Sequence, residues 1–192
     1  MGATTSYPFD RTTWALASAV GAAVLASSSI GAGGRSPMDR VYYAAIRGSV
    51  GIAPPTWLFG PAWALWMLAL SVNIILFANN PVVESGGGVA YSAVFWLFLA
   101  WLVTFSAWTP LFFTLRQTML ALFDSIAMLG ITVTIICVEI SAGETRLGMV
   151  YGLLIPIAVW LAYATLLTAL VLAKSTEIER TIQNSRPKMQ KQ

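Results

Sequence analysis

The 192-residue sequence predicts an all-α membrane protein, folded as a bundle of five transmembrane helices. Its residues are 57% hydrophobic and only 10% charged, whereas a soluble domain carries roughly 25% charged residues. Inside lipid the backbone groups must bond one another, which leaves helices or a closed barrel. The apolar residues form long continuous runs without strand-like alternation, and this pattern favours helices.

Five apolar runs are candidates for the membrane spans. In chain order they cover residues 13–30, 55–78, 89–113, 117–138 and 149–173. A polar lead, 1–12, precedes this 13–173 membrane domain, and a polar, basic tail, 174–192, follows it without an apolar face for a core. The first run also fits a cleavable signal peptide, although Asp10 beside Arg11 gives a poor positive lead.

The connections between these runs differ in length and polarity. Residues 31–51 form a long predicted loop with four charged residues and the pair Tyr42 and Tyr43. Loops of this length often act as lids over a site. Residues 114–117 form a tight predicted turn that carries Arg116, and residues 139–148 form a polar predicted loop.

The basic residues are distributed unevenly across the five spans. Nine of the eleven Lys and Arg residues fall on the side of the C-terminus, and only Arg11 and Arg146 fall on the other side. The positive-inside rule then predicts a cytoplasmic C-terminus and an N-terminus outside. A bacterial inner membrane and a eukaryotic organelle membrane, such as the mitochondrial outer membrane, both fit. Topology thus explains the basic residues, and no nucleic-acid partner is expected.

The composition excludes several kinds of chemistry. The chain has no histidine, which removes the commonest general base, metal ligand and haem ligand. Its single cysteine, Cys137, lies in an apolar run and forms no internal disulfide. We therefore expect no zinc site, no histidine-based catalytic triad and no required cofactor.

Aromatic residues recur at helical spacing on three of the predicted spans. The second carries Trp63, Trp66, Leu70 and Asn73; the third Phe98, Trp101, Phe105, Trp108 and Phe112; the fifth Pro156, Trp160, Tyr163 and Leu167. Each stripe alone is explained by helix packing or by a belt at the bilayer surface. Three stripes in one small bundle favour a cavity for a flat apolar ligand, because bulky rings hinder close helix approach.

Polar residues inside the predicted spans need partners. Asp124 lies about two turns into the fourth run, where an ionisable group costs several kcal/mol unless it is paired. An indole N–H, a hydroxyl group or Arg116 through water would serve, and both a structural and a functional role stay open. Asn73 and Gln117 are expected to bond between helices, and Gln117 with Arg116 could equally line the cytoplasmic end of a site.

Three blocks of this sequence resemble the translocator protein family, also called the tryptophan-rich sensory protein or TspO family. They read Pro-Pro-Thr-Trp-Leu-Phe-Gly-Pro-Ala-Trp at 54–63, Ala-Trp-Thr-Pro-Leu-Phe-Phe at 107–113 with Leu-Arg-Gln at 115–117 and Ala-Leu-Phe-Asp at 121–124, and Pro156, Trp160, Tyr163 and Ala164 in the fifth span. The resemblance covers about residues 40–172. It implies a five-helix bundle, often a homodimer, whose aromatic pocket is closed by the first long loop.

The resemblance also implies ligands and site residues. The family binds porphyrins, haem and sterols, so a membrane binding or sensory protein for tetrapyrroles, with sterols as a further class, is expected. The expected ligand-binding residues are Trp57, Phe59, Trp63, Trp66, Phe105, Trp108, Asp124, Trp160 and Tyr163. Some bacterial members are reported to degrade porphyrin in light, which would make Trp63 and Trp160 the catalytic candidates. A lipid or porphyrin transporter and a purely structural membrane subunit are also compatible with the sequence.

Overall fold

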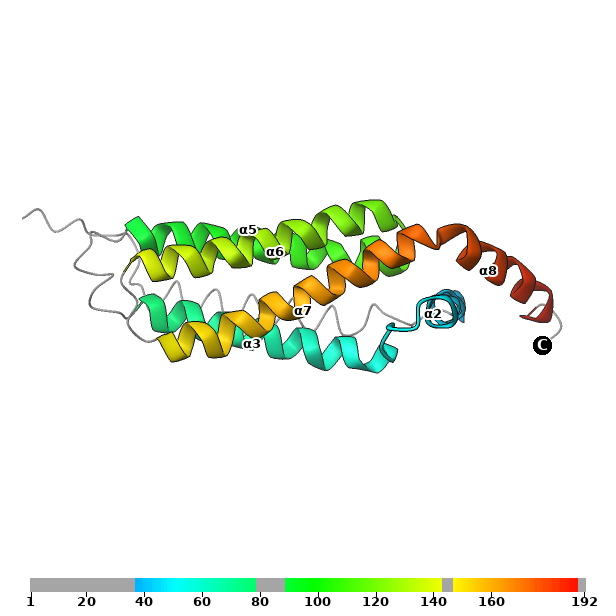
Figure 1. Ribbon diagram of the computed structural model, residues 1–192, viewed down its shortest axis with the longest axis horizontal. Helices are drawn as coiled ribbons and strands as arrows, with labels where there is room; N and C mark the ends of the chain where they lie inside the picture. The colour runs from blue at the N-terminus through cyan, green and yellow to red at the C-terminus, as the bar shows by residue number, and fades with distance from the viewer. Residues whose placement is uncertain (1–36, 79–88, 143–146, 190–192) are drawn as a thin grey trace, which may run out of the picture.

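The computed structural model describes residues 37–78, 89–142 and 147–189, and these residues are helical with no β-strand among them (Figure 1). The first predicted span, 13–30, lies outside the described residues. The all-α class is therefore confirmed for the part of the chain that is described, and the first span, and with it the total of five, stays a prediction.

Four helices are long and apolar enough to cross a membrane among the residues described. They are α3 (Phe59–Ala78, after a 3₁₀ turn η1, Thr56–Leu58), α5 (Val89–Thr109, continued by a π-helical turn η2, Pro110–Thr114), α6 (Thr118–Ser141) and α7 (Leu147–Ala173). Each has 20 residues or more, which at about 1.5 Å per residue spans the hydrocarbon core. The second to fifth predicted runs are confirmed.

The four spans pack side by side, with α6 between α5 and α7, and with α3 against α7 and α5 (Figure 1). Two buried side-chain hydrogen bonds join them. The indole N–H of Trp101 donates to Thr132 Oγ1 at 3.1 Å, and Asn73 Nδ2 donates to Glu139 Oε2 at 3.1 Å. Because lipid tails give helices little hydrophobic reason to associate, such bonds and close packing stabilise the bundle.

Glu139 corrects one prediction about the connections. The polar loop predicted over 139–148 is wrong at its start, because α6 continues to Ser141 and the side chain of Glu139 is 0% exposed. The amide of Asn73 donates a hydrogen bond that offsets part of the cost of burying Glu139. This bond joins α3 to α6, so the predicted interhelical bonding of Asn73 is confirmed.

The tight turn between the third and fourth spans is confirmed. Leu115 N–H bonds to Pro110 O and Gln117 N–H bonds to Leu111 O, which closes the chain over the π-helical turn. Arg116 takes the left-handed backbone conformation here, with φ of 55°. A side chain in that conformation costs about 1–2 kcal/mol, which glycine would avoid.

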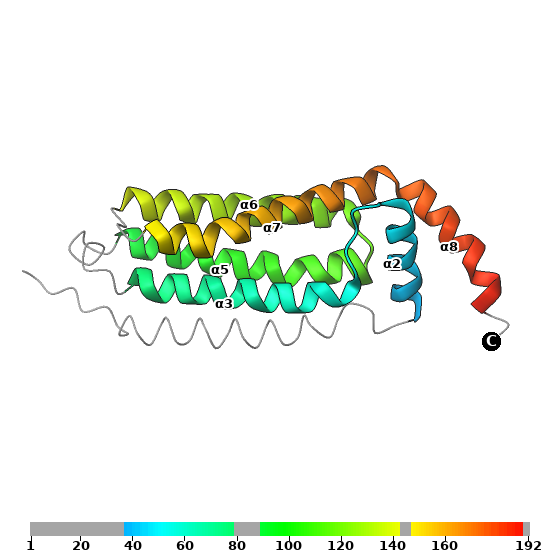
Figure 2. The same cartoon turned by 60° about the horizontal axis from the view of Figure 1, so that its bottom comes forward.

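The predicted loop at 31–51 is largely a helix, α2 (Pro37–Ser49). The flanking glycines and charged residues suggested a loop. However, Tyr42, Ala45, Ile46 and Ser49 have the i, i+3, i+4, i+7 spacing of one helix face and are buried against the rest of the protein. A helix therefore lies across the end of the bundle, where a long loop acting as a lid was predicted (Figure 2).

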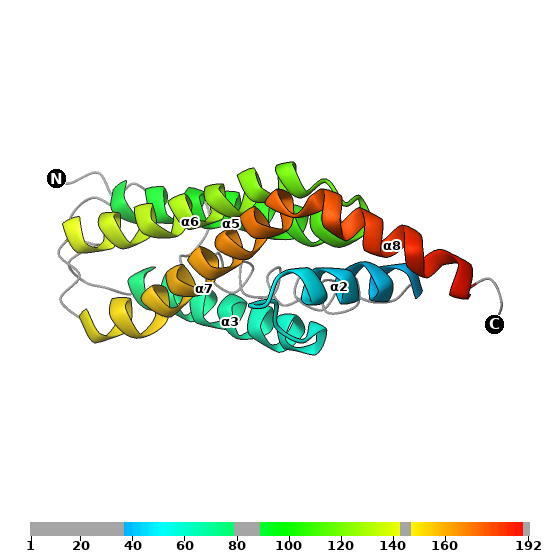
Figure 3. The same cartoon turned by 45° about the vertical axis from the view of Figure 1, so that its right-hand side comes forward.

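The tail is also wrongly predicted as lacking an apolar face. Residues Ser175–Met189 form helix α8, which follows α7 and lies beside α2 (Figure 3). Ile178 and Ile182, one turn apart, are buried and supply the apolar contact. Residues at this spacing share one face of a helix, so two isoleucines suffice for a narrow apolar stripe on an otherwise polar helix.

Three side chains hold the end of α2 and the segment that connects it to α3. The phenol of Tyr43 donates to Pro54 O at 2.7 Å, and the phenol of Tyr163 on α7 donates to Ile52 O at 2.8 Å. Lys174 Nζ donates to Ser49 O at 2.5 Å. The position of α2 is thus fixed from α7 and from the start of α8.

Candidate functional site

A continuous group of aromatic rings fills the bundle beneath α2, and we refer to it as the aromatic cluster. Its members come from four parts of the chain: Tyr43 on α2; Phe59, Trp63 and Trp66 on α3; Phe105, Trp108, Phe112 and Phe113 on α5 and η2; Trp160 and Tyr163 on α7. The three predicted stripes therefore converge, as expected for a shared site.

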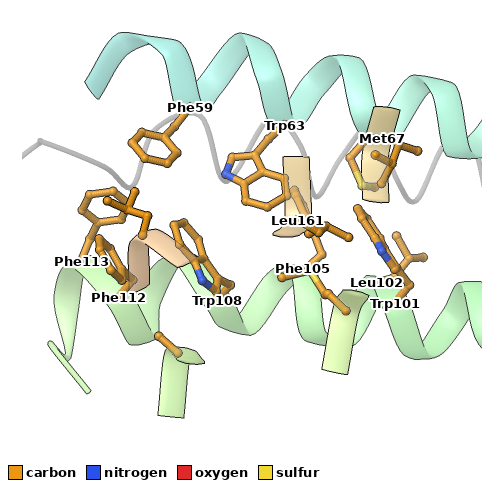
Figure 4. Packing of buried hydrophobic residues seen from close by; sticks show 14 of the residues in the cluster. Phe59, Trp63, Met67, Trp101, Leu102, Phe105, Trp108, Phe112, Phe113 and Leu161 are labelled. Carbon is orange, nitrogen blue, oxygen red and sulfur yellow. The ribbon is translucent and has the colours of Figure 1, made fainter. Parts of the chain in front are cut away.

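Trp63 lies at the centre of the cluster. Its ring centroid is 5.2 Å from Phe105, 5.5 Å from Trp108 and 6.3 Å from Trp160. Figure 4 shows Phe59 and Trp63 of α3 pointing toward Phe105, Trp108 and Phe113 on the facing segment, α5 and η2. Edge-to-face and tilted pairs at these distances are favourable, so the rings stabilise one another as well as forming a site.

Four tryptophans of the cluster have an indole N–H that is buried without a hydrogen-bond partner among the described residues. They are Trp63, Trp66, Trp108 and Trp160. Trp101 on the same helix as Trp108 differs, because its N–H donates to Thr132. A buried donor without an acceptor costs about 1–3 kcal/mol. Four such donors on rings in contact with one another are the most informative feature of the site.

Tyr43 and Phe59 connect the cluster to α2. Tyr43 lies 5.8 Å from Phe59 and 5.8 Å from Phe113, while its phenol bonds to Pro54 O. Burial raises the pKa of the Tyr43 phenol above its usual value of 10.0. The phenol therefore stays protonated and keeps donating to the carbonyl through the physiological range.

Most of the predicted site residues are brought together, and two are not. Trp57, in the 3₁₀ turn before α3, is 69% exposed and lies outside the cluster. Asp124 lies on α6, between the buried Ala121 and Ser125, and it is only partly buried. Its Oδ2 atom is buried without a hydrogen-bond partner among the residues described.

Three members of the cluster were not predicted as site residues: Tyr43, Phe112 and Phe113. Tyr43 was assigned to a loop, although its spacing from Ile46 and Val50 would have indicated a helix face. Phe112 belonged to a predicted stripe. Phe113 follows Phe112 directly in the π-helical turn, and both side chains are buried.

Comparison with known families gives a specific match. The sequence model of the TspO/MBR family matches residues 15–173. The chain belongs to the TspO/MBR family. No significant match was found to a curated protein or to a solved structure.

Membership of the TspO/MBR family, together with the four apolar helices, identifies a multi-pass membrane protein of a sensory and binding class. The match includes every span described and every ring of the aromatic cluster. It ends at Ala173, so α8 lies beyond the residues matched to the TspO/MBR family.

Proposed function

We propose that this TspO/MBR protein binds a tetrapyrrole, a porphyrin or haem, among the rings of the aromatic cluster. The observation that carries the proposal is the set of four buried indole N–H groups without acceptors among the described residues. A tetrapyrrole is flat and apolar over its face and carries carboxylates at its edge. It would therefore stack between rings and accept hydrogen bonds from indoles that otherwise lack them.

Such a ligand needs space that the contacting rings now occupy. The centroid of Trp63 lies 5.5 Å from that of Trp108 and 6.3 Å from that of Trp160, so binding must separate these rings. Helix α2 covers this end of the bundle and contacts the cluster through Tyr43. Movement of α2 with its connection to α3 is the route of access that this arrangement favours.

The test is a titration of the purified protein with protoporphyrin, followed by tryptophan fluorescence quenching and by the shift of porphyrin absorbance. The double variant Trp63→Phe/Trp160→Phe keeps two rings and removes two N–H donors. We expect affinity to fall roughly 5- to 150-fold, since each bond contributes about 0.5–1.5 kcal/mol. Unchanged affinity would exclude the cluster as the binding site.

Two matched variants complete the titration. Trp96→Phe changes a tryptophan of α5 that is 65% exposed, and it should leave affinity unchanged. Trp57→Phe tests the exposed tryptophan that the family resemblance assigned to the site. A loss of affinity in Trp57→Phe would indicate that Trp57 joins the site through a conformational change on binding.

A light- and oxygen-dependent oxidation of porphyrin is the second candidate. It is favoured by the direct contact of Trp63 with Trp160, which would place two oxidisable indoles against one ligand. Illuminating the complex in the presence of oxygen and following the products by mass spectrometry tests it. Porphyrin loss no faster than in free solution would leave binding as the function.

A further inference from the structure

A pocket of about 400 Å³ lies at the end of the bundle and borders the aromatic cluster, since the ring of Tyr42 in its wall lies 6.4 Å from that of Phe112. Helix α2, the turn at Arg116, the end of α7 and helix α8 surround it, and these elements lie together at one end of the molecule (Figure 3). None of the rings of the aromatic cluster lines it. The pocket depends on α8, which lies beyond the residues matched to the family.

Arg116 is a cation in the wall of this pocket. Its guanidinium lies 5.1 Å from the centre of the Tyr42 ring, and its Nε atom is buried without a hydrogen-bond partner in the part of the chain that the structure describes. The ring offers attraction to the positive charge but no acceptor for the N–H groups. An arginine held in this way, on a backbone with φ of 55°, is oriented for an anion in the pocket.

The other walls divide into a polar rim and an apolar floor. Glu179 on α8 and Gln117 in the turn bring a carboxylate and an amide to the rim. Val171, Ile178 and Ile182 line the pocket with buried apolar side chains. A soluble anion would gain nothing from that floor, whereas an amphiphile would bury a chain against it.

The position of the pocket identifies the source of such an amphiphile. It opens where α6 begins and α7 ends, which are the limits of two membrane spans. Lipid headgroups lie at this depth. We propose that the pocket binds a phospholipid with an amine in its headgroup, its phosphate on Arg116, its ammonium toward Glu179 and an acyl chain on the apolar floor.

The proposal is tested by thermal unfolding of the purified full-length protein in detergent, with added phosphatidylethanolamine, phosphatidylglycerol or inorganic phosphate. We expect phosphatidylethanolamine to raise the Tm most, and inorganic phosphate to leave it unchanged. Equal stabilisation by inorganic phosphate would overturn the lipid assignment in favour of a free phosphate site. Stabilisation by none of the three would overturn the site.

The variant Arg116→Gly separates an effect on lipid binding from an effect on folding stability. Glycine accepts a φ of 55° without strain, so this variant should unfold at the same or a higher Tm in the absence of lipid. Its apparent affinity for phosphatidylethanolamine should fall at least roughly tenfold, as expected for the loss of a charge-assisted bond. Retained affinity in this folded variant would overturn the role of Arg116.

Two further variants test selectivity. Glu179→Gln should weaken phosphatidylethanolamine binding while leaving phosphatidylglycerol binding unchanged, since only the former carries an ammonium. Arg180→Gln removes the neighbouring exposed charge of α8, which does not line the pocket, and should change neither. Changes of equal size and opposite sign in the two variants would reduce the effect to net charge and contradict the assigned contacts.

Discussion

Tyr43 shows how one side chain serves both the covering helix and the site. Its ring belongs to the aromatic cluster, and its phenol bonds to the carbonyl of Pro54. That carbonyl precedes Pro55, which has no N–H, so this stretch of backbone has few other ways to be held. A tyrosine at position 43 therefore supplies both the ring that packs in the cluster and the hydroxyl that holds the proline-rich connection.

We predict that Tyr43→Phe costs about 1 kcal/mol, because it removes this bond and keeps the ring. The pKa of Tyr43 is raised by burial above the usual 10.0, so the wild-type protein should keep its stability up to about pH 10 and lose it as the pH rises further. Thermal unfolding from about pH 7 to about pH 11 measures both effects. The pKa of Tyr42 is raised in the same sense, so Tyr43→Phe should reduce the alkaline loss without abolishing it; an identical loss would contradict the assignment.

Sequence alone predicted which rings face inward but not which of their polar atoms are satisfied. The spacing of Trp63, Trp108 and Trp160 fixes their faces, whereas a bond such as that of Trp101 to Thr132 depends on the register between two helices. Trp57, which the family resemblance assigned to the site, lies outside the aromatic cluster. It lies six positions before Trp63, and at roughly 100° per residue the two side chains lie about 120° apart on a helix.

At the scale of the element, the long apolar helices were predictable and the short amphipathic ones were not. Length and hydrophobicity define α3, α5, α6 and α7 with little help from context. Helices α2 and α8 carry many charges, and the apolar stripe of each is only a few residues wide. Each buries its stripe largely against the other, so neither sequence alone reveals the contact.

We predict that the contact of α8 holds α2 in place. The double variant Ile178→Ala/Ile182→Ala should release α8, because burying an isoleucine instead of alanine contributes about 2–5 kcal/mol. Hydrogen exchange at residues 42–50 should then accelerate while the four spans remain protected. Arg180→Ala, an exposed position between the two that lines neither contact with α2, is the control. Unchanged protection of α2 would show that the bonds from Tyr163 and Lys174 suffice.

At the scale of the whole molecule, the two ends of the bundle differ in character. Helix α2, the Arg116 turn and helix α8 gather at one end, and Arg40, Arg47, Lys174 and Arg180 belong to those elements or adjoin them (Figure 2). The structure thus brings together these four basic residues, which sequence counting assigned to one side of the membrane. The proposed orientation places this end in the cytoplasm.

Cysteine labelling in intact cells tests this orientation. In a Cys137→Ala background, Gln183→Cys on α8 should react with a membrane-impermeant maleimide only after the cytoplasmic side is opened. Thr145→Cys, between α6 and α7, should react from outside. The reverse pattern would invert the proposed topology.

The bond from Tyr163 to the carbonyl of Ile52 has a consequence for signalling. Tyr163 follows Trp160 by about one helical turn on α7, and the two rings are 5.5 Å apart. A ligand bound as proposed that turned the indole would also disturb the tyrosine, and the displacement would reach the backbone just before the proline pair. Binding inside the bundle would thereby change the exposed connection at Ile52.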